Sequence, residues 1–139
     1  KFPFKLDLIR GSHIILEGQC RQPFFLEVPK DNRFIFILPW KDSTLVGTTE
    51  VRQSLNEQII CGKEEKEYLL NAWSYYFPKI EPKVIDSFAG VRPLIHEPKN
   101  PSNITRDYAI HKADNLVTIY GGKWTTALAL AKKVVETIS

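Results

Sequence analysis

Short apolar runs, separated by prolines, glycines and charged residues, fill the N-terminal part of the chain. Runs of this length and composition are typical of strands in a sheet. Pro39 ends the third run, and the sequence KDS that follows is typical of a turn, so we predict a hairpin over residues 33–51. The four predicted strands are residues 11–18, 22–29, 33–40 and 44–51.

The pattern changes at Lys63, where the spacing of apolar residues becomes that of a helix. In KEEKEYLLNAWSYYF, acidic residues fill the first turn and apolar residues recur three and four positions apart. Pro78 follows directly and stops helices. We therefore predict an amphipathic helix over residues 63–77, with its apolar side formed by Tyr68, Leu69, Ala72, Trp73, Tyr76 and Phe77.

The C-terminal half adds more strands and a closing helix. VIDSFAGVRPL reads as a strand, and the polar segment IHEPKNPSNIT, with two prolines, reads as a loop. Residues 107–113 and 115–121 form a second predicted hairpin, and a helix runs from about Lys123 to the end. Residues 52–62 give the weakest pattern. The prediction is a single α+β domain over residues 1–139, with a mostly antiparallel sheet and helices packed on one face.

Composition and charge narrow the class of protein. The 139 residues are 43% hydrophobic and carry a net charge of +3, with basic and acidic residues interspersed. This favours a soluble globular domain and speaks against a nucleic-acid partner. Cys20 and Cys61 lie far apart and near no histidine cluster, so we expect no metal site. The chain opens at Lys1 without an initiator methionine, and we expect a piece of a longer protein.

The segment GGKWTT is the first candidate for chemistry. Gly121 and Gly122 allow a tight turn and close approach of a ligand to the backbone. The N–H groups at the start of the following helix favour negative charge, and Lys123 adds a full positive charge. On spacing alone, a plain turn with a helix capped by Thr125 or Thr126 is the more common structure.

Two arginines and a histidine are the remaining candidates. Arg92 lies in the apolar strand GVRPL, where it either forms an ion pair or grips a carboxylate or phosphate. Arg106 follows the proline-rich loop; it is either a solvated or ion-paired loop residue, or completes an anion pocket with Arg92 and Lys123. His13 stands at the start of an apolar strand, where it is either a structural hydrogen-bond partner or a general base.

Taken together and in order, these segments are more specific than each alone. GSHII, FIFILPW, TLVGTTE, AGVRPL, TRDYAIH and YGGKWTT resemble the FAD-dependent glycerol-3-phosphate dehydrogenases. That family belongs to the flavoprotein group that includes D-amino-acid oxidase and glycine oxidase. The resemblance runs from about Arg10 to Ala131, and TRDY and GGKxTT point to the glycerol-3-phosphate branch.

The resemblance implies oxidation of sn-glycerol 3-phosphate to dihydroxyacetone phosphate, with hydride transfer to FAD and onward transfer of electrons to a quinone or oxygen. It implies His13 as base, Arg92 as the residue that orients substrate, and Arg106 with Lys123 as phosphate ligands. The flavin would lie beside Gly121, Gly122, Lys123 and Thr125. It also implies a cytoplasmic location, with or without peripheral attachment to the inner face of the membrane.

The chain departs from the full family pattern. It has no GxGxxG turn with a ribose-binding acid, and TTAL stands where the family continues TTYR. We therefore interpret it as the substrate-binding middle of such an enzyme and expect the isolated chain to bind FAD poorly. Two alternatives stay open: a related flavoenzyme acting on an amino acid or 2-hydroxy acid, and an anion-binding module without chemistry.

Overall fold

The structure, a computed structural model, describes residues 3–138. Its strands are β1 (Leu6–Glu17), β2 (Phe24–Val28), β3 (Arg33–Trp40), β4 (Ser43–Gly47), β5 (Val51–Gln53), β6 (Val84–Ile95), β7 (Tyr108–Ala113) and β8 (Leu116–Gly121). Its α-helices are α1 (Lys63–Tyr76) and α2 (Ala127–Ile138), and its 3₁₀ turns are η1 (Pro101–Asn103) and η2 (Trp124–Thr126). The pairs β1–β4, β2–β3, β3–β4 and β7–β8 are antiparallel, so the predicted α+β class is confirmed.

The chain divides into two compact units. Unit 1 comprises Lys1–Ile9, Arg52–Ser54 and Arg92–Ser139, and unit 2 comprises Arg10–Val51 and Leu55–Val91. Strands β1, β5 and β6 each contribute residues to both units. Each unit has a buried apolar cluster of its own.

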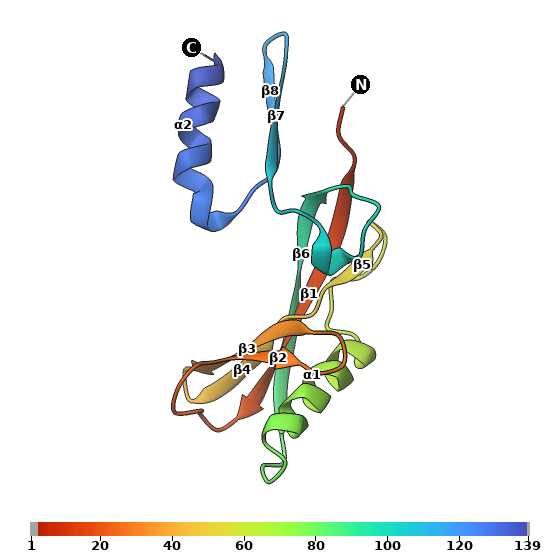
Figure 1. Cartoon of the computed structure of the whole chain (residues 1–139), viewed down its shortest axis with the longest axis vertical. Helices are drawn as coiled ribbons and strands as arrows, with labels where there is room; N and C mark the ends of the chain where they lie inside the picture. The colour runs from red at the N-terminus through yellow and green to blue at the C-terminus, as the bar shows by residue number, and fades with distance from the viewer. Residues whose placement is uncertain (1–2, 139) are drawn as a thin grey trace. The chain divides into compact units, whose positions relative to one another are not determined.

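In unit 2, α1 lies against one face of the sheet (Figure 1). The sheet runs in the order β2-β3-β4-β1-β5, and β6 also pairs with β1. Leu69 and Trp73 of α1 pack with Ile14, Ile37 and Val46 from the three central strands. Full burial of each large apolar side chain contributes about 1.5–3 kcal/mol, so this layer is the main source of the unit's stability.

Strand β3 shows how the sequence sorts the two faces of this sheet. Ile35 and Ile37 are fully buried toward α1, whereas Phe34 and Phe36 on the opposite face are each 48% exposed. Alternate side chains of a strand point to opposite faces, which accounts for this division. Phe25 of β2 stacks on Phe34, with ring centroids 4.5 Å apart, so the second face carries an exposed aromatic cluster.

Strand β1 begins at Leu6, five residues earlier than predicted, because its charged residues find partners. Asp7 is buried; its two carboxylate oxygens lie 2.9 Å from Arg52 and 2.8 Å from Nδ1 of His96. Burial favours the protonated acid, but the hydrogen bonds from His96 and Arg52 hold the pKa of Asp7 below its ordinary value. A second difference is that the predicted strand 44–51 is divided between β4 and β5.

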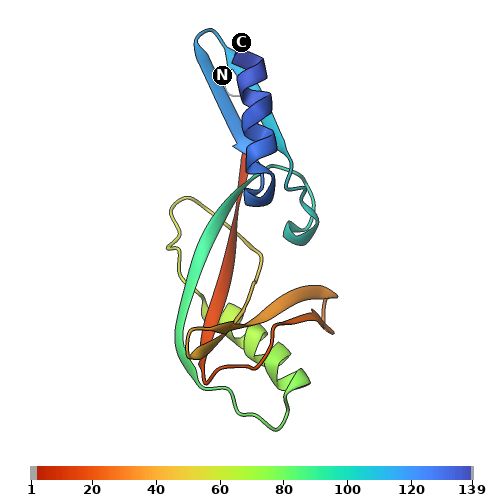
Figure 2. The ribbon, with the colours of Figure 1, turned by 90° about the vertical axis from the view of Figure 1, so that its left-hand side faces the viewer.

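In unit 1, α2 lies alongside the β7–β8 hairpin (Figure 2). The ammonium group of Lys112 donates to the Thr137 carbonyl at 2.9 Å, and Lys133 lies over the ring of Tyr108 at 5.4 Å from its centroid. The predicted hairpin and closing helix are therefore both present. Among residues 3–138, no helix is long and apolar enough to cross a membrane.

Candidate functional site

His13 lies in the middle of β1, not at the start of a strand as the sequence indicated. The registers of the sheet place it in a row with Gly47 of β4, Phe36 of β3 and Phe25 of β2. Its imidazole lies directly over Gly47, where a Cβ would be only 2.1 Å from Cδ2. On its other side the ring stacks on Phe88 of β6, at 5.0 Å between centroids and 11° between planes. The half-buried imidazole is thus held between a glycine and an aromatic ring.

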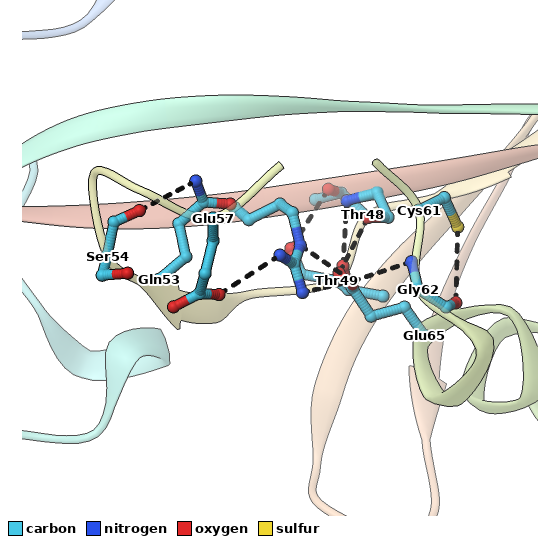
Figure 3. Close-up of polar contacts among 10 residues, drawn as sticks. Thr48, Thr49, Gln53, Ser54, Glu57, Cys61, Gly62 and Glu65 are labelled. Atoms are coloured by element: carbon cyan, nitrogen blue, oxygen red, sulfur yellow. Dashed lines mark hydrogen bonds and ion pairs between the residues drawn. The ribbon is translucent and has the colours of Figure 1, made fainter. Parts of the chain in front are cut away.

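A buried polar cluster surrounds the carboxylate of Glu65 (Figure 3). It adjoins Ser12, whose side chain points to the face of β1 opposite that of His13. Glu65 of α1 is 5% exposed, and its carboxylate accepts hydrogen bonds from the hydroxyls of Ser12 and Thr49. Its second oxygen accepts from Nε of Arg10 at 2.9 Å and from the backbone N–H of Gly62 at 3.2 Å. Burial raises the pKa of Glu65, but these bonds more than offset it and hold the pKa below its ordinary value.

In unit 1, Gly121 and Gly122 form a turn that requires glycine. Their φ angles are +70° and +99°, a region that other residues rarely adopt. The Gly122 N–H donates to the Asp107 carbonyl at 3.2 Å, and Gly121 pairs with Tyr108 across the hairpin. A Cβ on Gly121 would lie 2.4 Å from the Asp107 carbonyl oxygen, so the backbone contact excludes any side chain.

The closing helix α2 begins at Ala127, four residues later than predicted, because the 3₁₀ turn η2, which contains Thr125 and follows Lys123, comes first. Lys123 is the N-cap residue and makes no capping bond with its side chain, and η2 leads directly into α2. The predicted threonine cap is not formed: Thr126 directs both its N–H and its hydroxyl to the Lys123 carbonyl, and Thr125 is exposed. The first N–H groups of a helix have no partner within it, so this end suits an anionic group.

A groove of about 560 Å³ adjoins this helix start. Gly121, Gly122 and Lys123 line it together with apolar residues of β8, η2 and α2, which are Ile119, Trp124, Ala127, Leu130, Ala131, Val134 and Val135. A Cβ on Gly122 would lie 3.2 Å from Leu130, so the turn and helix are closely fitted. A flat apolar cofactor with a polar edge fits such a lining.

The two arginines also belong to unit 1. Arg106 is exposed and directly precedes Asp107, whose carbonyl binds Gly122, so Arg106 and Lys123 flank the same backbone contact. Arg92 is half-buried in β6; Ile95, which ends that strand, lies 3.6 Å from a Cβ on Gly121. The backbone positions of Arg106 and Lys123 therefore lie beside the glycine turn at one end of the hairpin, and Arg92 is three residues before Ile95 in β6.

Six of the seven predicted site residues thus lie in unit 1, and His13 lies in unit 2. Gly47 and Phe88, which contact His13, and the buried Glu65 were not identified as candidates from the sequence. A signal for Glu65 was present, because it lies four residues before Leu69 and eight before Trp73, on the apolar side of α1. A charged residue on a buried helix face needs partners, and here these come from β1 and from the segment after β4.

Comparisons with known proteins support the resemblance that these segments indicate. The family described as FAD dependent oxidoreductase (DAO) matches residues 1–137. The chain is 33% identical to the aerobic glycerol-3-phosphate dehydrogenase of Escherichia coli (strain K12), and the match covers 99% of this chain and 30% of that protein. It is 32% identical to the enzyme of the same name from Staphylococcus aureus (strain USA300), over 97% of this chain and 26% of that protein.

A solved structure is similar over the same length. The glycerol-3-phosphate dehydrogenase from Bacillus halodurans, complexed with FAD, superposes with a TM-score of 0.79 at 29% identity, covering 99% of this chain and 27% of that one. The chain therefore spans less than a third of the length of these relatives.

Proposed function

Because the chain belongs to the FAD-dependent oxidoreductase family, we propose that it is the substrate-binding part of an enzyme that oxidises sn-glycerol 3-phosphate to dihydroxyacetone phosphate. One observation carries the proposal in particular. Arg106 and Lys123 flank the backbone bond between Asp107 and Gly122 at an uncapped helix start. A phosphate dianion uses several cationic and N–H partners at once, whereas a single carboxylate needs fewer.

In this proposal, Arg106 and Lys123 bind the phosphate. Both side chains are exposed, so a ligand can reach them from solvent. The N-terminal end of η2 and α2, which follows Lys123, carries partial positive charge and adds to their attraction for the dianion. Arg92 orients the hydroxyl or the phosphate with its planar guanidinium group.

His13 is the proposed base for the proton of the C2 hydroxyl. Histidine is the residue type most often used as a general base near neutral pH. The contacts with Gly47 and Phe88 restrict the ring, which keeps the accepting nitrogen in a defined place. Such orientation is a large part of what an enzyme contributes to a proton transfer.

FAD supplies the acceptor for the hydride when it is bound. The turn at Gly121 and Gly122, the helix start at Lys123 and Thr125, and the apolar groove beside them are the residues of this chain that would adjoin it. The backbone N–H groups there would favour negative charge at the polar edge of the cofactor. The electrons then pass to a quinone or to oxygen, and the enzyme is cytoplasmic, free or peripherally bound at the inner face of the membrane.

The test uses the longest natural protein that contains this chain. We expect it to be yellow and to be bleached by glycerol 3-phosphate without oxygen. Bleaching by an amino acid or a 2-hydroxy acid, with glycerol 3-phosphate inactive, would refute the phosphate pocket. Tight stoichiometric binding of FAD by the 139-residue chain alone would contradict its assignment as a part that lacks the main FAD-binding region.

Variants of the same protein separate the proposed roles. Arg106→Ala should raise KM for glycerol 3-phosphate by at least about tenfold, since a charged hydrogen bond is worth about 1.5–3 kcal/mol. Arg92→Ala should weaken transition-state binding by about 2–5 kcal/mol if it pairs with a buried anion. His13→Ala should lower turnover by about 10²–10⁴-fold. Lys132→Ala, exposed on α2, is the control and should change neither constant.

A further inference from the structure

We propose that Glu65 is a positioning residue for His13: its buried carboxylate joins Ser12 and Thr49 and so sets the place of the imidazole. The proposal deepens the function proposed above, because it concerns the residue named there as the base. All the residues involved belong to unit 2.

The carboxylate of Glu65 does more than cap its helix. A residue at this position of a capping box needs only one oxygen, to accept the N-cap N–H. Here one oxygen accepts from Gly62 at 3.2 Å and from Arg10 at 2.9 Å, and the other accepts from Ser12 at 2.8 Å and from Thr49 at 2.5 Å. Glu65 therefore links α1 to β1 and to the segment that follows β4.

Ser12 and Thr49 are also bound to each other. The Ser12 N–H donates to the Thr49 hydroxyl at 2.9 Å, and the Thr49 N–H donates to the Ser12 carbonyl at 3.3 Å. Both residues are almost fully buried, so water cannot replace these bonds cheaply. These hydrogen bonds join β1 and the segment after β4 to each other and to Glu65 at one position along the strands.

His13 follows Ser12 in β1 and so lies at the same position along the strands. Successive side chains of a strand point to opposite faces, so Ser12 pointing toward Glu65 directs His13 to the other face. There the imidazole contacts Gly47, two residues before Thr49, and stacks on Phe88. A shift of β1 against β4 would carry the ring away from both neighbours. Glu65 itself is on the far face, so it acts through Ser12 and Thr49 and does not touch the reacting atoms.

The first test observes the ring directly by NMR of the ¹³C-histidine-labelled chain. The chain has three histidines, and stacking on Phe88 gives the His13 protons a ring-current shift. We expect Glu65→Gln to remove most of this shift, while His96 and His111 of unit 1 keep their resonances. The matched control is Glu67→Gln, an exposed residue of the same helix, which should leave all three unchanged. A His13 shift that persists in Glu65→Gln overturns the proposal.

A second variant covers the case in which Glu65→Gln does not fold. Ser12→Ala removes one bond to the carboxylate and keeps the charge pair between Glu65 and Arg10. It should displace the His13 resonances in the same direction, and unchanged resonances in a folded Ser12→Ala chain overturn the proposal.

Turnover by the longer enzyme gives an independent measure. Misplacement of a catalytic group by about 1 Å lowers the rate by about 10²-fold, so we expect Glu65→Gln to lower kcat by about 10–100-fold per bound FAD. KM for glycerol 3-phosphate should stay within about threefold, because the lost interaction concerns the reaction step. Wild-type kcat for Glu65→Gln overturns the proposal. A wild-type enzyme that glycerol 3-phosphate does not reduce refutes the proposed function alone, since the NMR test needs no turnover.

Discussion

Replacing Gly47 by alanine is the sharpest test of how His13 is held. A Cβ at this position would lie 2.1 Å from Cδ2, 2.7 Å from Cγ and 2.8 Å from Nε2 of His13. Ordinary van der Waals contact begins at 3.4 Å, so the imidazole must retreat by about 1.3 Å. Phe88 is stacked behind it and opposes the movement.

The expected loss of stability follows from these contacts. Forcing a methyl group into a filled site typically costs about 1–3 kcal/mol. Separating the stacked rings adds about 0.5–1.5 kcal/mol, although Phe88 is 44% exposed and can turn toward solvent. We therefore expect Gly47→Ala to lower the free energy of unfolding by about 2–4 kcal/mol. In the longer enzyme, turnover should fall nearly as far as in His13→Ala.

Urea unfolding followed by circular dichroism measures the loss, and Gly90→Ala is the matched control. Gly90 lies in β6, has an ordinary φ, and has no atom within 4 Å of its Cβ position. Gly90→Ala should change the free energy of unfolding by less than about 1 kcal/mol. A small gain is expected, because alanine restricts the unfolded chain more than glycine does. If Gly47→Ala is as stable as Gly90→Ala and keeps the His13 resonances, the contact described between His13 and Gly47 is wrong.

Two further predictions concern unit 1. The pKa of Asp7 is lowered in the fold, so its stabilising contribution is complete above its ordinary pKa, near 4, and is lost as the pH falls below that value. Asp7→Asn should therefore lower the free energy of unfolding at pH 7 and make it fall less steeply between about pH 4 and 2. Urea unfolding at each pH measures both effects. If the free energy of unfolding falls as steeply in Asp7→Asn as in the wild type, Asp7 does not contribute to the loss of stability in acid. The hydroxyl of Tyr120 is buried and has no hydrogen-bond partner within residues 3–138. Tyr120→Phe should leave the melting temperature unchanged or raise stability by about 1 kcal/mol, whereas a clear loss would reveal a partner for the hydroxyl.

The sequence was most informative where one residue type dominates the local geometry. The helix before Pro78 and the hairpin ending in Gly121 were predicted almost to the residue, because proline stops a helix and two adjacent glycines allow a turn that other residues rarely adopt. The start of β1 was missed because Asp7 and Arg10 interrupt the apolar pattern, and their charged partners become known only from the fold.

The residues of the candidate site also differ in how far the sequence alone predicts them. Gly121, Gly122 and Lys123 are adjacent in the chain, so their pattern could be recognised without knowledge of the fold. The partners of His13 come from strands β4 and β6, and only the strand order brings them together. Glu65 differs from its acidic neighbours in its spacing from Leu69 and Trp73, which places it on the helix face toward the sheet, but its partners become known only from the fold.

The tryptophans give each unit an optical reporter. Trp73 is 7% exposed in the core of unit 2 and donates its indole N–H to the Ile80 carbonyl at 3.1 Å, so its fluorescence should be blue-shifted until that unit unfolds. Trp124 is 94% exposed in unit 1 and lines the groove beside Lys123, so its emission should be that of indole in water. A ligand entering the groove would quench Trp124 and leave Trp73 unaffected. With the exposed Trp40 replaced by phenylalanine, a single emission spectrum would therefore report binding in one unit and unfolding in the other.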